Sequence, residues 1–200
     1  LLPVEVHTGE AVTAEQVKNM GADVVILATG STPIMPRVPG INDPKVVGCM
    51  DAFAHPEKVG QRVVVIGGGL VGCEMALDYA QEGKEVTVVE ALPKILSSGI
   101  PSPIPNGQMI PDLFEYHHVN VLEGHKLSAV VDGKAILDCD GQKKELEADT
   151  FVIAVGFRPA PSMAQELSDC GAAVYEIGDE QQVSTILHAV WDGYEVGNNI

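Results

Sequence analysis

The chain has 200 residues, of which 46% are hydrophobic and 20% are charged, and this composition is typical of a globular protein rather than a disordered one. Its 28 acidic and 12 basic residues give a formal charge of -16, which repels phosphodiester backbones and anionic lipid surfaces. The longest apolar runs are far shorter than the roughly 20 residues that a membrane span needs. We therefore expect neither a nucleic-acid partner nor a membrane partner.

The first ten residues lack the basic start and the long apolar centre of a signal peptide, so no export signal is visible. The four cysteines lie too far apart in the sequence for a C-x-x-C redox or zinc motif, and we interpret them as buried thiols, which fits a reducing, cytoplasmic setting. No metal site is predicted. The cysteines are Cys49, Cys73, Cys139 and Cys170.

The first clear element is a strand over residues 24–28, where a continuous apolar run is typical of a strand buried on both faces of a parallel sheet. Upstream, residues 1–21 indicate only a short strand and a short helix. Prolines between residues 33 and 44 disfavour helix, so the stretch 35–44 is interpreted as a connector between structural units.

A βαβ unit is predicted next. Residues 62–66 and 85–90 have the composition of strands, and apolar residues at helical spacing between 70 and 80 predict a helix with one buried face. Gly83 is expected to cap the carboxyl end of that helix. The whole segment has about 30 residues, the size of one such unit.

The segment 97–111 carries four prolines and two glycines, so we predict a surface loop that leads into a short helix around 112–118. Asp-Gly pairs at 132–133 and 140–141 predict the tight turns of a small antiparallel ribbon. The remaining predicted elements are a buried strand over 151–155, a short strand that ends at Gly178-Asp179 and a terminal helix within 184–200.

The chemistry is expected at the glycine-rich turn between the first strand and the helix of the βαβ unit. Gly67, Gly69 and Gly72 give a G-x-G-x-x-G motif in which the glycines permit a tight turn, a close approach of backbone to a pyrophosphate, and close helix–strand packing. The pyrophosphate would lie at the helix N-terminus, where N–H groups and the helix dipole favour an anion. The alternative is a glycine turn that serves packing alone.

Glu90 follows 18 residues after Gly72 (90 − 72) at the end of the next strand, near the spacing expected for an acidic ribose-binding residue. Its carboxylate can accept hydrogen bonds from both ribose hydroxyls and repels a 2′-phosphate. The motif therefore favours NADH over NADPH. Lys94 is a nearby cation that would soften this preference.

Residues 63–96 resemble the NAD-binding segment of the pyridine nucleotide-dependent flavoprotein oxidoreductases. The chain is similar in particular to the C-terminal half of NADH:flavin oxidoreductases of the 2-enoate reductase, 2,4-dienoyl-CoA reductase and trimethylamine dehydrogenase type. Residues 22–41 resemble the segment that leaves the family's FAD domain, and 151–159 resemble the end of its NAD domain. The stretches 174–179 and 186–200 resemble its return to the FAD domain.

The resemblance implies an α/β protein with two domains. A Rossmann-like NAD-binding domain with a β-meander is expected over residues 46–160. An incomplete, three-layer FAD-binding domain is expected from residues 1–45 and 161–200. No first FAD fingerprint and no initiator methionine occur, so the simplest interpretation is a fragment of a longer parent protein.

The resemblance also assigns residues to the NAD site. Glu90 would contact the adenosine ribose and Glu74 the nicotinamide end, with Val155 and Gly156 beside the same ring. For Glu74, a solvated helix residue is the open alternative. The turn that contacts the pyrophosphate comprises Gly67, Gly68, Gly69, Leu70, Val71 and Gly72.

For the FAD site, the resemblance implies that Thr29 and Gly30 approach the flavin dinucleotide. Asp179 would bind its ribityl or phosphate region through the turn at Gly178. The alternative for Asp179 is an acidic residue that caps the terminal helix.

The function implied is transfer of hydride from NADH to the FAD of the parent protein, with the cofactors carrying the chemistry and no catalytic side chain in this chain. The partners would be the dinucleotides and the rest of the parent polypeptide, namely the other FAD half-domain and a possible flavin barrel. The fragment alone would be inactive. Two alternatives are a module that holds NADH or ADP without redox turnover, and a fragment of a lipoamide dehydrogenase-like disulfide oxidoreductase.

Overall fold

The computed structural model describes residues 3–99 and 104–200, and the chain divides into two compact units. Unit 2 is continuous and runs from Thr32 to Arg158. Unit 1 combines the chain through Ser31 with Pro159–Ile200. The boundaries between the two units therefore lie at 31/32 and 158/159, whereas the sequence suggested domain boundaries at 45/46 and 160/161.

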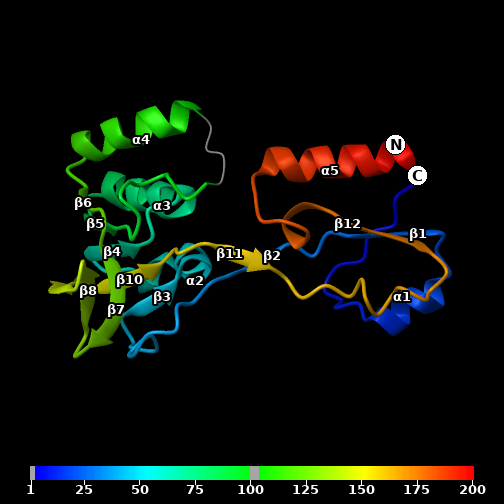
Figure 1. Cartoon of the computed structure of the whole chain (residues 1–200), viewed down its shortest axis with the longest axis horizontal. Helices are drawn as coiled ribbons and strands as arrows, with labels where there is room; N and C mark the ends of the chain where they lie inside the picture. The colour runs from blue at the N-terminus through cyan, green and yellow to red at the C-terminus, as the bar shows by residue number, and fades with distance from the viewer. Residues whose placement is uncertain (1–2, 100–103) are drawn as a thin grey trace. The chain divides into compact units, whose positions relative to one another are not determined.

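Unit 2 is built on a parallel sheet with the strand order β3-β10-β4-β5-β6 (Figure 1). This confirms the predicted α/β class. Strands β4, β5 and β10 were predicted, and β3 was not, because its short apolar run follows a proline-rich connector. The bounds are β3 Val46–Gly48, β4 Arg62–Ile66, β5 Glu85–Val89, β6 Asn120–Leu122 and β10 Thr150–Ile153.

The sheet is buried on both faces because alternate residues of its strands enter two different hydrophobic clusters. On the helix side, Val63 and Val65 pack with Cys73 and Ala76. On the other side, Val64, Ile66 and Phe151 pack with residues of an antiparallel meander, among them Leu127 and Leu137. A central strand that faces apolar layers on both sides has to be continuously hydrophobic, as β4 is.

Helix α3 spans Leu70–Gln81 and packs on the sheet, as predicted. It ends in the expected glycine cap, since Gly83 has φ +81°. The Gly83 N–H donates to the Ala80 carbonyl and the Lys84 N–H donates to the Tyr79 carbonyl, both at 3.0 Å. These two bonds form a Schellman motif, which satisfies carbonyls at the helix end.

Helix α4 spans Ile104–Tyr116, so the prediction of a loop up to residue 111 is wrong for residues 104–111. Residues 100–103 of that predicted loop lie outside the described part of the chain. Pro111 lies inside the helix, where a proline ring crowds the carbonyl four residues earlier. Prolines generally disfavour helix, but Pro105 lies in the first turn, where its missing N–H has no helical partner to lose.

The meander follows as β7 (Lys126–Val131), β8 (Lys134–Cys139) and β9 (Gln142–Glu147). Both predicted Asp-Gly turns are confirmed. Asp132 and Gly133 have φ +50° and +69°, and Asp140 and Gly141 have φ +52° and +83°. Positive φ at both central residues is the geometry that favours glycine and aspartate in two-residue hairpins.

A further helix of unit 2 was not predicted. Helix α2 spans Cys49–Ala54 and is followed by a single 3-10 turn, η1, at Pro56–Lys58. Helix α2 has only six residues, too few for its apolar spacing to stand out in the sequence. It buries Cys49 and Ala52 against the sheet.

Unit 1 contains a two-stranded parallel sheet of β1 (Val24–Leu27) and β12 (Ala173–Glu176), with α1 (Ala14–Met20), the 3-10 turn η2 (Gly178–Glu180) and α5 (Ile186–Asn199). The predicted terminal helix is confirmed. The prediction that the first strand is buried on both faces is wrong, because Ile26 is 42% exposed. The short strand expected before α1 does not form in residues 3–13. None of the described helices is both long and apolar enough to cross a membrane.

The chain passes between the units through β2 (Ser31–Pro33) and β11 (Phe157–Pro159), which pair with each other. Within unit 2, the Arg158 Nε donates to the Thr32 hydroxyl at 3.4 Å, and the Ile34 N–H donates to the Gly156 carbonyl at 2.9 Å. The two ends of unit 2 therefore lie side by side.

Candidate functional site

Two glycines of the turn after β4 are required by packing. Gly67 has φ +114°, and a Cβ there would lie 2.3 Å from the Ala154 carbonyl oxygen. A Cβ on Gly72 would lie 1.9 Å from the Gly67 carbonyl oxygen. Neither contact is sterically tolerable, so these glycines let α3 begin directly against the strand ends.

Gly69 differs, because a Cβ there would meet no atom within 4 Å. It is the N-cap of α3, and no side chain caps the helix. The N–H groups of the first turn, at Leu70, Val71 and Gly72, have no acceptor inside the helix. Open space at Gly69 and these donors together fit an anionic group such as a pyrophosphate.

The peptide groups of Gly68 bond within the protein. Its N–H donates to Glu90 Oε2 at 2.6 Å, and its carbonyl accepts the Leu96 N–H at 2.7 Å and the Cys73 thiol at 3.3 Å. A Cβ on Gly68 would lie 2.7 Å from a methyl group of Ile95 and 3.0 Å from the Glu90 Cβ. Gly68 thus holds Glu90 in place, and its predicted contact with a cofactor stays a prediction.

Glu90 is only 9% exposed, and its carboxylate is oriented by two backbone donors. Besides the Gly68 bond, the Leu92 N–H donates to Oε1 at 2.6 Å. A carboxylate has about four lone-pair positions, so each oxygen retains capacity for one more donor. Lys94, the predicted modifier of this site, forms no ion pair within the described part of the chain.

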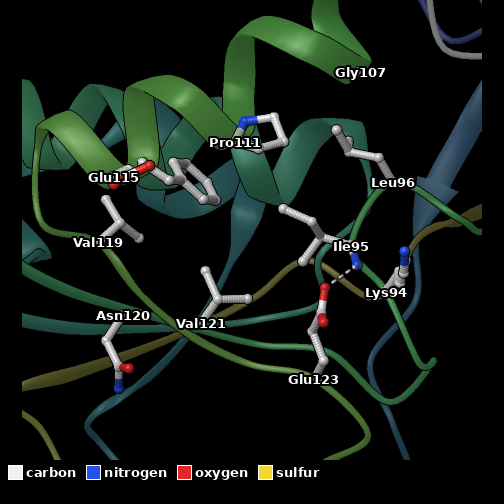
Figure 2. Close-up of a pocket in the computed structure, with 11 residues that line it drawn as sticks. Lys94, Ile95, Leu96, Gly107, Pro111, Glu115, Val119, Asn120, Val121 and Glu123 are labelled. Atoms are coloured by element: carbon white, nitrogen blue, oxygen red, sulfur yellow. Dashed lines mark hydrogen bonds between the residues drawn. The ribbon is translucent and has the colours of Figure 1, made fainter.

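The loop after β5 also forms one wall of a cavity of about 640 Å³. Figure 2 shows Pro111 and Glu115 of α4 on one side of this cavity and Val121 of β6 on the other. The Glu123 carboxylate accepts the Ile95 N–H at 2.9 Å, and this bond fixes the loop that holds Gly68. The loop that lines one side of the cavity is therefore the same loop that holds Gly68 of the glycine turn.

The remaining predicted NAD-site residues lie at the same end of the sheet or on α3. Val155 is the second residue after β10, and its N atom would lie 3.0 Å from a Cβ on Gly67, so the two residues are neighbours. Gly156 follows with φ +105°. Glu74 is exposed on α3 and accepts a long hydrogen bond of 3.5 Å from Asn106 of α4.

These residues gather where β4, β5 and β10 end. The strands β5 and β6, which follow β4 in the chain, lie on one side of β4 in the sheet. The strands β10 and β3 lie on its other side. Such a reversal of strand order is a topological switch point, and ligands of open parallel sheets bind outside the carboxyl ends of the strands at that point. The fold thus brings the predicted glycine turn, Glu90 and Val155 to one location.

A second cluster lies in unit 1, at the carboxyl ends of β1 and β12. The Ser31 hydroxyl donates to Asp179 Oδ2 at 2.8 Å, and the Ser184 N–H donates to Asp179 Oδ1 at 3.1 Å. Thr185 is the N-cap of α5 and makes no side-chain cap bond. Asp179 therefore does not cap the terminal helix; it ties the turn after β12 to Ser31 at the start of β2.

The glycines of this second cluster have left-handed backbones. Gly30 has φ +76°, and a Cβ there would meet no atom within 4 Å. Gly178 has φ +64°, and its N–H donates to Asp192 of α5 at 3.0 Å. The four residues predicted for the FAD site, Thr29, Gly30, Gly178 and Asp179, thus lie in two neighbouring turns.

Sequence reasoning missed Glu180, which is 4% exposed. Its Oε2 accepts both the N–H and the hydroxyl of Thr29, each at 2.7 Å. Burial by itself raises the pKa of Glu180, but donors from Thr29, with a contribution from Ser162, outweigh burial and hold the pKa below its usual value. The only sequence signal is an acidic residue directly after Gly178-Asp179.

Of the thiols, that of Cys73 supports the glycine turn through its bond to the Gly68 carbonyl. All four cysteines are free, and Cys49 and Cys73 are buried. Burial raises the pKa of Cys73 to about 12, with smaller contributions from Glu90 and Glu74, so this thiol next to the glycine turn stays protonated. Within residues 3–99 and 104–200, no group of three or more metal-binding side chains could hold a metal ion.

The sequence matches the family described as pyridine nucleotide-disulphide oxidoreductase over residues 4–191. It is 37% identical to the cinnamate reductase of Clostridium sporogenes over 199 residues, which are 100% of this chain and 30% of that protein. The NADH oxidase of Thermoanaerobacter brockii is 34% identical, with 96% of this chain and 30% of that protein covered.

Among solved structures, a 2-naphthoyl-CoA reductase superimposes with a TM-score of 0.84 at 29% identity, covering 94% of this chain and 28% of that one. The chain therefore spans about 30% of the length of the curated relatives it matches. The suspected resemblance to this class of reductases is confirmed. The family match, the two relatives and the solved structure all agree: the chain belongs to the pyridine nucleotide-disulphide oxidoreductase family.

Proposed function

We propose that this chain is the NADH-binding portion of an FAD-dependent oxidoreductase and that hydride passes from NADH to the flavin in a longer parent protein. The observation that carries this proposal is the glycine turn of unit 2, where open space at Gly69 and free helix donors adjoin the oriented Glu90 carboxylate. When bound, the nicotinamide and the flavin supply the redox chemistry.

Each residue of the NAD site has a definite task in this proposal. Gly67 and Gly72 keep α3 close to the strand ends, and the N–H groups from Leu70 to Gly72 bind the pyrophosphate. Glu90 binds the adenosine ribose. Glu74, Val155 and Gly156 serve the nicotinamide end, the first from α3 and the other two from the end of β10.

NADH is preferred over NADPH because of the way Glu90 is held. Two backbone N–H groups fix its carboxylate at 2.6 Å each, so it cannot swing away from a 2′-phosphate without losing both bonds. A phosphate placed against this carboxylate would be repelled, whereas vicinal hydroxyls would donate to it. Lys94 lies four residues further on and reduces the preference without reversing it.

The FAD site is assigned to unit 1 and to the remainder of the polypeptide. Thr29, Gly30, Gly178 and Asp179 contribute two turns at the ends of adjacent parallel strands. The other half of the site, and a possible flavin barrel, would come from the rest of the parent protein, a division that the 30% coverage of the relatives supports. We place the protein in the cytoplasm.

The names of the relatives support a reductase of the enoate or dienoyl-CoA type, since they include a cinnamate reductase and a 2-naphthoyl-CoA reductase. A disulfide oxidoreductase of the lipoamide dehydrogenase kind receives no support from this chain's own thiols, because its four cysteines are free and far apart in sequence. A nucleotide module without turnover would bind NADH but would not reduce the flavin.

Calorimetric titration of the chain with NADH and NADPH tests the first half of the proposal. We expect tighter binding of NADH. Gly69→Ala should weaken NADH binding by about tenfold or more, because the new methyl group enters the open space beside the helix donors. Gly197→Ala, whose Cβ also meets no atom within 4 Å, is the matched control and should bind normally. Tighter binding of NADPH would refute the assignment of Glu90.

Glu90→Gln tests the cofactor preference directly. The amide keeps the size of the side chain but removes the charge, so affinity for NADPH should rise relative to NADH. Glu123→Gln is the control, because Glu123 also accepts a loop N–H but plays no part in ribose recognition. An unchanged ratio of the two affinities in Glu90→Gln would contradict the proposal. Hydride transfer is then measured in the full-length protein as flavin bleaching by NADH.

A further inference from the structure

The further inference concerns the buried carboxylate of Glu180. A carboxylate removed from water is costly unless hydrogen bonds or a cation compensate it. Glu180 has no cation partner within the described part of the chain, and its two bonds of 2.7 Å both come from Thr29, while Ser162 contributes only a weaker interaction. Its second oxygen, Oε1, is buried without any hydrogen-bond partner among the described residues.

Glu180 determines what Thr29 can offer to a ligand. Both donors of Thr29, the N–H and the hydroxyl, bond to Glu180 Oε2 at 2.7 Å. A hydroxyl has one proton to donate, so Thr29 has no donor left for a bound dinucleotide. The next residue, Gly30, has open space beside its Cα, because an added Cβ would meet no atom within 4 Å.

A second bond ties the same two turns together. The Ser31 hydroxyl donates to Asp179 at 2.8 Å, so consecutive acidic residues after β12 each hold a residue after β1. Of the two acidic residues, Glu180 is the buried one, and its carboxylate accepts two hydrogen bonds from Thr29, whereas Asp179 is half-buried. Thr29 and Glu180 are 151 residues apart, so their contact joins two turns that are distant in the sequence, together with the Ser31–Asp179 bond and the pairing of β1 with β12.

We propose that Glu180 is a positioning residue of the FAD site: it engages both donors of Thr29 and so makes the Gly30 backbone, rather than the Thr29 hydroxyl, the contact to the dinucleotide. This inference rests on the assignment of the FAD site to unit 1. Glu180 acts through Thr29 and is no catalytic residue.

The test uses the full-length protein and FAD as the probe. FAD is removed and its dissociation constant on rebinding is measured by fluorescence, for wild type, Glu180→Gln, Glu180→Ala and Thr29→Val. We expect Glu180→Ala to weaken FAD binding by about tenfold or more, which is the loss expected when hydrogen bonds to a charged group are removed. Glu180→Gln should fall between wild type and Glu180→Ala, because its amide oxygen still accepts one donor.

Two further measurements separate positioning from general stability. Hydrogen exchange of the peptide that contains Thr29 should speed up in both Glu180 variants, and the double variant Glu180→Ala/Thr29→Val should bind FAD no more weakly than Glu180→Ala alone. Thr29→Ser restores the hydroxyl donor and should bind FAD more tightly than Thr29→Val. Thr150→Val, which removes a buried hydroxyl that accepts the Gly60 N–H in unit 2, is the control for loss of a buried bond.

The outcomes distinguish this inference from the proposed function. Wild-type affinity for FAD in Glu180→Gln and Thr29→Val would overturn the role of Glu180, and so would equal weakening by Thr150→Val. If Glu180→Ala fails to fold, the other two variants still decide the question. Absence of FAD binding by the wild-type full-length protein would instead refute the proposed function itself.

Discussion

Units 1 and 2 are both α/β, yet different interactions stabilise them. Nearly all buried apolar side chains lie in unit 2, where sheet, helices and meander enclose them; in the described part of unit 1, only Leu27 and Leu167 are comparably buried. Unit 1 leaves apolar side chains of α5 exposed, including Trp191 at 69%. Its strand ends are instead joined by polar bonds, such as the Thr29–Glu180 pair. Apolar residues at helical spacing therefore predict a helix with one apolar face, but they do not show that another element packs on that face.

The largest expected effect tests this contrast directly. Phe151→Ala removes a fully buried ring from unit 2 and should lower the free energy of unfolding by about 3–5 kcal/mol. Trp191→Ala removes an even larger side chain from unit 1 and should cost less than about 0.5 kcal/mol, because Trp191 is exposed. Urea denaturation of this chain measures both. Similar losses in the two variants would show that α5 is covered in solution.

The next effect compares two glycines of one turn. Gly72→Ala places a methyl group 1.9 Å from the Gly67 carbonyl oxygen and should lower the free energy of unfolding by about 1–3 kcal/mol. Gly69→Ala meets no atom within 4 Å and should leave stability within about 0.5 kcal/mol of wild type while weakening NADH binding. If Gly69→Ala destabilised the chain as much as Gly72→Ala, the open space at Gly69 would not exist.

A smaller effect of opposite sign is expected inside the core of unit 2. The Tyr79 hydroxyl is buried without a hydrogen-bond partner among the described residues, and burial raises the pKa of Tyr79 to about 12. Tyr79→Phe removes this uncompensated polar atom and should raise the free energy of unfolding by about 1 kcal/mol. Thermal unfolding measures the change, and a clear loss of stability would show that the hydroxyl is bonded.

The smallest expected effect concerns the pH dependence of unit 1. Because the folded pKa of Glu180 lies below its usual value, the ionised carboxylate stabilises the fold above the unfolded pKa of about 4.3, and this contribution is lost as pH falls through the folded pKa. The difference in unfolding midpoint between wild type and Glu180→Gln should therefore shrink as pH falls from about 6 to about 3. A difference that is constant over this range would contradict the assignment.

The glycine turn after β4 was predictable because its determinants are local in the sequence. Within 30 residues the sequence contains an apolar strand, three glycines at fixed spacing and apolar residues at helical spacing. The two hairpin turns are likewise predicted from adjacent residues, Asp132 with its following glycine and Asp140 with its own. The positions of these elements follow from steric rules that act on neighbours in the chain. The burial of β4 could be inferred because a continuous apolar run favours a strand that is packed on both faces, although the same rule fails for β1, where Ile26 is exposed.

The features that escaped prediction depend on distant contacts or on overridden local preferences. Glu180 gains its importance from Thr29, which lies 151 residues away, and no local pattern indicates that contact. The early start of α4 overrides the usual effect of its prolines, and Gly107 four residues before Pro111 adds a further helix-disfavouring residue. The exposure of Ile26 depends on what covers β1, which its own sequence does not specify.

The paired strands β2 and β11 have an architectural consequence. The Thr32 and Arg158 side chains are within hydrogen-bonding distance. The chain therefore enters unit 2 and leaves it through the same pair of strands. An insertion with adjoining ends can be excised, transplanted into another host or exchanged for a relative's counterpart without spanning a gap. Residues 32–158 therefore have the geometry of an exchangeable insertion, and under the proposed function an exchange of this whole unit would transfer its cofactor preference.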